Sequence, residues 1–190
     1  MNDANLGQQK GARGKGLPIT SRMLIGAVAG LVGTMAMTAA MRRLHQRLPE
    51  PERYPLPPRE IVDSAALQAG SSLGGEAAKD VTTAAHFAYG AASGALLGVA
   101  NVMVGPVSGG MAGVGVWLAS YMGWLPGARI LKPATEHPPR RNLVMLAAHV
   151  VWGVATARGM RELVAARAEM LADGRDRDLP PEAHEEGDAG

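Results

Sequence analysis

Four blocks of the chain lack lysine, arginine, aspartate and glutamate, and polar segments separate them. The blocks predict helices over residues 23–41, 81–104, 107–125 and 142–157. The longest helix would reach roughly 36 Å at about 1.5 Å per residue. A hydrocarbon core is about 30 Å thick, so uncharged helices of this length are typical of membrane spans. The pattern therefore predicts an all-α, four-transmembrane-helix bundle with polar disordered tails.

The second and third helices form one uncharged stretch, residues 81–128, that is interrupted at Gly105-Pro106. Proline breaks a helix because it lacks an N–H and clashes with the preceding turn. We therefore expect a helical hairpin with almost no loop. Tyr121 and Trp124 near its end are typical of aromatic anchors at the membrane interface.

The first and fourth helices each need a further argument. Residues 23–41 follow a basic tail, so a cleaved signal peptide is the alternative interpretation. Arg42-Arg43 and the three later blocks favour a retained helix. Residues 142–157 span only about 24 Å. This helix can still cross if Arg141 and Arg158 extend their charged ends toward the membrane surfaces.

The polar segments complete the predicted organisation. Prolines exclude regular structure from the first part of the loop formed by residues 42–80, and its second part predicts a short helix over residues 59–69. Residues 158–172 continue as an amphipathic helix. Residues 1–22 and 173–190 are expected to be a disordered basic tail and a disordered acidic tail.

Composition agrees with helices packed in lipid. The mean hydropathy is only +0.01 because polar tails dilute the apolar blocks. Gly occurs 25 times and aromatic residues make up 4% of the chain, and small residues allow close helix packing in membranes. The absence of cysteine excludes disulfides, thiolate catalysis and cysteine-bound zinc. A net charge of +2 gives no argument for nucleic-acid binding.

Two segments of the chain match. Residues 84–90 read AAHFAYG and residues 147–153 read AAHVVWG. Each follows a loop that contains Pro-Pro-Arg, at residues 57–59 and 138–140. The match predicts two repeated helical hairpins in parallel orientation, because an even number of spans restores the direction of the chain. Chance similarity in a chain rich in alanine and glycine is the alternative.

The chain resembles a family at the same positions. A glycine-rich first span that ends in AMTAA, a loop with PPRE, and HFAYGAASGALLG are similar to small bacterial inner-membrane proteins of the uncharacterised YagU-like family. The resemblance covers about residues 20–160. It implies a place in the inner membrane and an unassigned function linked to acid stress. It implies no catalytic residues.

Glycines at four-residue spacing predict close helix crossings, since positions i and i+4 share one helix face. We expect them to pack the bundle together, with dimerisation through an outward ridge as the alternative. These glycines are Gly26, Gly30, Gly90, Gly94, Gly98, Gly109 and Gly113.

Polar residues inside the spans are the candidates for a functional site: His86, His149, Asn101 and Thr34. One hypothesis gives each histidine a structural hydrogen bond to Thr34 or Thr38 on a neighbouring helix. A second gives the histidines a proton-linked or substrate-binding role. A third makes them axial ligands of one haem b. We expect no other metal site, because the spans hold no carboxylates, and Asn101 is expected to bind free backbone groups at the turn.

These patterns predict a multi-pass integral protein of the inner membrane with a non-enzymatic, structural or stress-related role. The chain has no Walker loop, HExxH motif or Ser/His/Asp set, so an enzyme is not expected. The alternatives are a small transporter or proton-responsive channel that uses the two histidines, and a haem-binding protein. The expected partners are the lipid bilayer and a second copy or another membrane protein, not nucleic acid. Basic residues flank both membrane sides in similar number, so the orientation stays open.

Overall fold

The computed structural model describes residues 17–100 and 105–172, and within them the chain is helical without strands. Four long elements follow one another: α2 (Ile19–His45), α4 (Gly75–Ala100), α5 (Pro106–Leu118) and α7 (Pro139–Glu169). The shorter elements are η1 (Glu50–Glu52), α3 (Pro57–Gln68), η2 (Ala119–Trp124), α6 (Leu125–Gly127) and η3 (Ala134–Glu136).

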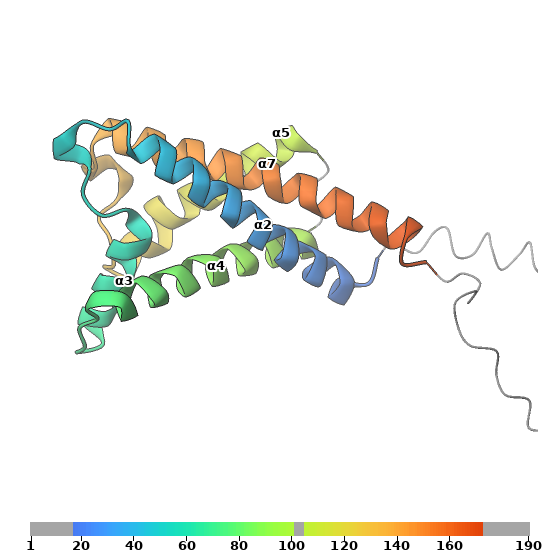
Figure 1. Cartoon of the computed structure of the whole chain (residues 1–190), viewed down its shortest axis with the longest axis horizontal. Coiled ribbons are helices and arrows are strands. Elements are labelled where there is room, and N and C mark those ends of the chain that lie inside the picture. The colour runs from blue at the N-terminus through green and yellow to red at the C-terminus, as the bar shows by residue number, and fades with distance from the viewer. Residues whose placement is uncertain (1–16, 101–104, 173–190) are drawn as a thin grey trace, which may run out of the picture.

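α2 and α7 pack against each other as the central pair of the bundle. α4 packs against α2, and α5 packs against α7. α4 and α2 cross near the end of the bundle where α2 begins and α7 ends, and they diverge toward the other end (Figure 1). The short helix α3 lies at this second end and packs against α4.

The ends of the helices follow from their sequences. Pro57, Pro106 and Pro139 lie in the first turns of α3, α5 and α7, where the missing N–H has no helical partner to lose. Arg42, Arg43 and His45 lie in the last turn of α2, where positive charge complements the helix dipole.

Several helices begin earlier than predicted: α4 begins at Gly75 rather than at residue 81, and α7 begins at Pro139 rather than at residue 142. α2 begins at Ile19, inside the expected tail of residues 1–22. α3 begins at Pro57 rather than at residue 59, because prolines fit a first helical turn as well as a loop. The fourth helix was expected to continue over residues 158–172, and α7 does run unbroken from Pro139 to Glu169. Residues 1–16, 101–104 and 173–190, including Asn101, lie outside the described residues.

Two of the four expected spans meet the length and hydropathy of a membrane-crossing helix in the described part of the chain, α2 and α7. α4 begins among charged residues and carries His86 and Tyr89 in its apolar half, which lowers its hydropathy. α5 ends after 13 residues, where the wider π-helical turn η2 begins.

Glycine makes the helix crossings close. A Cβ atom on Gly30 or Gly94 would lie closer than 3.0 Å to backbone atoms of the facing helix at the crossing of α2 and α4. The same holds for Gly113 and Gly153 at the crossing of α5 and α7. Gly33 gives α2 a third close approach, to Trp152 and Thr156 of α7, which the sequence did not predict.

Candidate functional site: a histidine cavity among the helices

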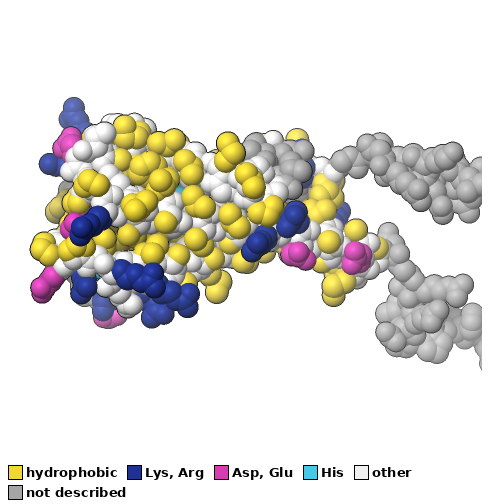
Figure 2. Space-filling view, turned by 90° about the horizontal axis from the view of Figure 1, so that it is seen from above, with side chains coloured by type: hydrophobic (Ala, Val, Ile, Leu, Met, Phe, Trp, Pro, Cys, Tyr) yellow, Lys and Arg dark blue, Asp and Glu magenta, His cyan; other side chains and the backbone are white. Residues whose placement is uncertain are grey.

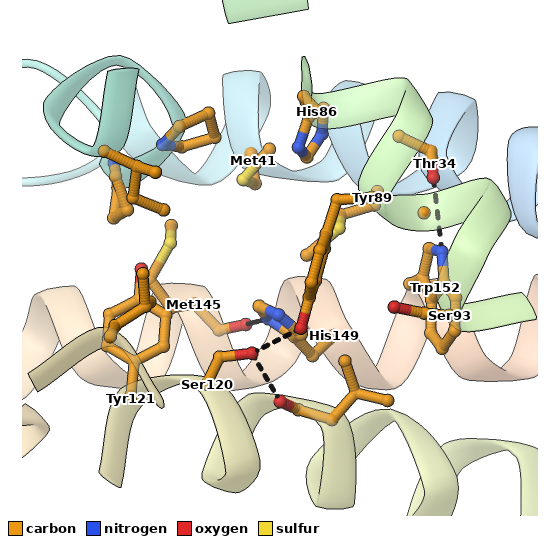
Figure 3. Close-up of a pocket in the computed structure, with 17 residues that line it drawn as sticks. Thr34, Met41, His86, Tyr89, Ser93, Ser120, Tyr121, Met145, His149 and Trp152 are labelled. Carbon is orange, nitrogen blue, oxygen red and sulfur yellow. Dashed lines mark hydrogen bonds between the residues drawn. The ribbon is translucent and has the colours of Figure 1, made fainter. Parts of the chain in front are cut away.

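The two matching histidines face one cavity. His86 comes from α4 and His149 from α7, and both line a space of about 70 Å³ between the helices (Figure 3). Its wall also contains Ser93 and Tyr89 from α4 and Tyr121 from η2. The matching segments of the sequence therefore bring their histidines to the same place.

Each histidine has one hydrogen-bond partner in the helices. His86 Nε2 lies 3.2 Å from Thr38 Oγ1 of α2, one of the two threonines predicted as partners. His149 Nδ1 lies 2.7 Å from the carbonyl oxygen of Met145. A carbonyl only accepts hydrogen bonds, so Nδ1 carries a proton there and Nε2 of the neutral ring is the acceptor.

Thr34, the other predicted partner, contacts neither histidine. Its hydroxyl donates to the carbonyl of Gly30 at 2.8 Å and accepts from Trp152 Nε1 at 3.2 Å. This buried pair joins α2 to α7 at the end of the cavity away from α3 (Figure 3). Thr34 therefore serves the packing of the site rather than its chemistry.

Tyr121 is a cavity residue that the sequence did not identify. Its side chain is only 5% exposed, so its prediction as an interfacial anchor is wrong. Its ring lies 6.5 Å from the ring of His149, edge to face, and stacks on Trp117 at 5.7 Å. The π-helical turn changes the direction of the side chains around Tyr121, and such turns are common at functional sites.

One hydrogen bond bridges the side of the cavity between α4 and η2. Tyr89 Oη lies 2.8 Å from Ser120 Oγ, and the ring of Tyr89 lies 5.9 Å from that of Trp124 (Figure 3). Ser120 donates its own proton to the carbonyl of Val116 at 2.8 Å, so Tyr89 is the donor to Ser120.

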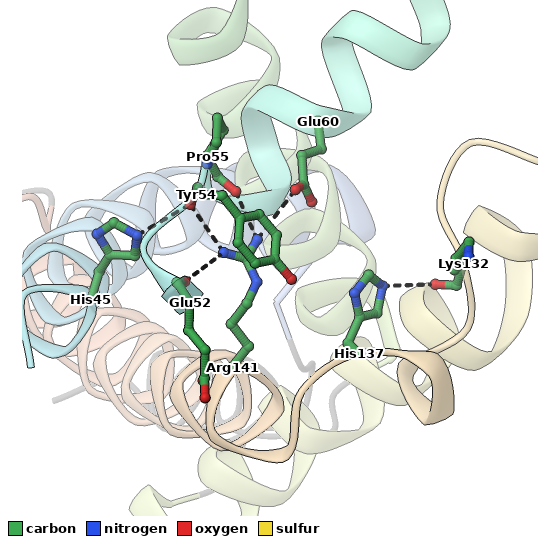
Figure 4. A network of polar contacts seen from close by, with 8 residues as sticks. All are labelled: His45, Glu52, Tyr54, Pro55, Glu60, Lys132, His137 and Arg141. Atoms are coloured by element: carbon green, nitrogen blue, oxygen red, sulfur yellow. Dashed lines mark hydrogen bonds and ion pairs between the residues drawn. The ribbon is translucent and has the colours of Figure 1, made fainter. Parts of the chain in front are cut away.

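A buried arginine organises the opposite, loop-side end. Arg141 in the first turn of α7 is 3% exposed. Its Nη atoms donate to the carbonyls of Tyr54 at 3.0 Å and Pro55 at 2.7 Å (Figure 4). Nη2 also lies 3.3 Å from Oε1 of Glu60, and the guanidinium carbon lies 3.5 Å from the centre of the Tyr54 ring. The sequence had assigned this arginine to the membrane surface.

Glu60 shares this environment. Burial raises the pKa of its carboxyl above the ordinary value, and the charges of Arg141 and His137 act in the opposite direction. The aromatic ring of Tyr121 lies 6.4 Å from that of His137, so the cavity and this polar cluster are neighbours. Glu60 itself does not line the cavity, but it precedes the lining residue Ile61, so its carboxyl belongs to the polar cluster beside the loop-side end.

The cavity limits the chemistry. Its volume of about 70 Å³ is a few water molecules in size. Sites for drug-sized ligands and cofactors measure about 300–1,000 Å³. The space between the histidines is therefore too small for a haem as it stands. In the described residues, no three His, Cys, Asp or Glu side chains come together as a metal site would require. The exposed wall of the cavity is mostly apolar, and the space has room for a few water molecules or one small molecule, with the two histidines among the polar groups that line it.

The fold and the site define the described part of the chain as all-helical, with two membrane-capable helices and a mostly apolar internal cavity that two histidines line. No family model, curated protein or solved structure matches the chain. The resemblance to the YagU-like family stays a prediction.

Proposed function

We propose that the protein is a multi-pass integral membrane protein, with α2, α4, α5 and α7 crossing the bilayer. The distribution of large and small side chains carries this proposal. Large apolar side chains face outward, among them Leu96 at 71% and Val107 at 79% exposure. Glycine, alanine, serine and threonine supply much of the contact between helices. Water disfavours such a surface, whereas lipid matches it.

The central helices support this proposal further. Only 33% of the most apolar 18-residue stretch of α2 is buried, whereas the core helix of a soluble protein is mostly buried. Arg22 and Arg42 bracket the apolar part of α2, and Arg141 and Arg158 bracket that of α7. Hydrophobic side chains cover the middle of the face in Figure 2, and charged side chains gather toward its ends.

Fractionation tests the membrane location. We expect the full-length protein to remain in the membrane pellet after washes with alkaline carbonate, and to require detergent for extraction. A folded monomer in the aqueous fraction without detergent would contradict the proposal.

Cysteine labelling distinguishes four spans from two, because the chain contains no cysteine of its own. Four spans place Ser72 and Thr135 on one side and Gly105 on the other. If only α2 and α7 crossed, all three positions would lie on the same side. A side chain at Gly105 meets no atom within 4 Å, so Gly105→Cys is a mild change. An impermeant maleimide applied from each side to the three single variants measures their location.

We further propose a non-enzymatic role in the inner membrane, structural or stress-related as the YagU-like resemblance implies. A second candidate is a small transporter or proton-responsive channel. The observation that favours it is the position of His86 and His149 in one cavity. This candidate predicts that His86→Ala or His149→Ala alters pH-dependent flux in proteoliposomes while the protein stays folded. Equal flux in the two variants and in the unchanged protein would contradict the transporter or channel hypothesis.

A further inference from the structure

The loop-side end of the cavity is closed by a helix of its own. Pro57, Pro58 and Ile61 of α3 line the cavity from this end. α3 is connected to α4 by residues 69–74, and Gly70 and Gly75 near the ends of this connection adopt positive φ angles of 71° and 57°. No atom would lie within 4 Å of a Cβ on either glycine. The two glycines therefore let the chain turn between α3 and α4 in open space.

α3 packs against α4, and two side chains add hydrogen bonds that fasten it to other parts of the bundle. Arg141 holds the segment just before α3 through the carbonyls of Tyr54 and Pro55, and it holds α3 itself through Glu60. At the other end of α3, Gln68 Nε2 donates to the carbonyls of Ala128 at 3.3 Å and Arg129 at 3.1 Å. Arg141 is buried and Gln68 is exposed, so the arginine is the stronger of the two attachments.

We propose that α3 is a lid over the histidine cavity, that Arg141 is its latch, and that water or a small polar molecule enters from the aqueous loop side. This inference rests on the proposed role of the cavity as the functional centre of a membrane protein. The competing route is lateral, from lipid between α4 and η2, where the hydrogen bond from Tyr89 to Ser120 closes the wall.

A single cysteine inside the cavity measures access. Ser93 is buried and lines the cavity, and cysteine is close to serine in size. The rate at which Ser93→Cys reacts with a charged, water-soluble thiosulfonate reports how often the loop side opens. The exposed Ser72→Cys gives the intrinsic reactivity of the reagent under the same conditions.

To test Arg141 as the latch, Arg141→Gln is added to the Ser93→Cys variant and the labelling rate of the cysteine is compared. We expect labelling to accelerate about tenfold, the change in open fraction that corresponds to losing a charged hydrogen bond. Arg140→Gln removes the same charge from the exposed neighbouring position and should leave the rate unchanged. Gln68→Ala loosens the exposed end of α3 and should accelerate labelling about threefold, even if Arg141→Gln fails to fold.

Tyr89→Phe tests the lateral route, since it removes the hydroxyl that bonds Ser120 and keeps the ring. Lateral entry predicts faster labelling by a membrane-soluble maleimide in Tyr89→Phe and no effect of the α3 attachments. That result would overturn the proposal that α3 is a lid. Equal labelling rates of the cavity cysteine in Gln68→Ala and Arg140→Gln would overturn it as well. If the protein remains in the membrane pellet while the lid fails, the proposed function survives. If the protein leaves the membrane fraction, the proposed function fails separately.

Discussion

Gly113→Ala tests whether helix contact through glycine builds the site. A Cβ on Gly113 would lie closer than 3.0 Å to the carbonyl oxygen and carbon of His149, both backbone atoms that no rotamer change can move. The α5 and α7 helices would have to separate, and such overpacking costs about 1–3 kcal/mol. Alanine also favours the helix by about 1 kcal/mol relative to glycine. The net change in the free energy of unfolding is therefore smaller than the steric cost alone.

Gly115→Ala is the matched control, because it lies on the same helix and a Cβ there meets no atom within 4 Å. The helix-propensity gain is the same for both variants and cancels in their comparison. We expect Gly113→Ala to be less stable than Gly115→Ala by about 1–3 kcal/mol. Thermal unfolding in detergent, followed by circular dichroism and by tryptophan fluorescence, measures the difference. Equal midpoints for the two variants would show that the crossing of α5 and α7 is looser than described.

Three further predictions concern the polar groups. Thr34→Val removes the acceptor of the buried Trp152 indole N–H and should lower the free energy of unfolding by about 1–3 kcal/mol, measured by thermal denaturation. Burial raises the pKa of Glu60 in the closed state, and the value in an open, solvated state is the ordinary 4.5, so protons bind the closed state more tightly. Labelling of the cavity cysteine, corrected for thiol ionisation, should slow as pH falls through the raised pKa toward 4.5, and Glu60→Gln should abolish this dependence. Purified protein expressed with added haem should show no Soret band, and a band lost in both His86→Ala and His149→Ala would contradict the size argument.

The distribution of charge was enough to predict the long helices. In the described residues each uncharged block is helical, because an uninterrupted run without proline can satisfy its backbone polar groups internally. The same pattern could not give the ends of the helices. Residues 42–45 and 75–80 are polar and yet helical, since helix formation continues past the point where an apolar face is needed.

Tyr121 and Arg141 show why the site was predicted only in part. An α-helical projection sets side-chain directions by a constant period, and the π turn that contains Tyr121 breaks that period. Gly123 in this turn and Pro126 after it mark an irregularity in the sequence but do not give its direction. Arg141 lies at the end of an apolar block, where snorkelling to the surface is the usual expectation. Its burial depends on the carbonyls of a loop 86 and 87 residues earlier in the chain, which no local pattern contains.

The residues that follow the two Pro-Pro-Arg segments relate the Arg141 contact to the matching units of the sequence. Glu60 directly follows the first segment and Arg141 directly follows the second, so corresponding positions of the two matching units form the ion pair. In the second unit α7 runs unbroken from Pro139 past His149, whereas in the first unit the chain leaves the helix after Gln68 and restarts at Gly75. The longer spacing of the first unit therefore releases its opening turns from the helix that carries His86. An extra segment in one unit of a matching pair would produce a single lid over a cavity to which both units contribute a histidine.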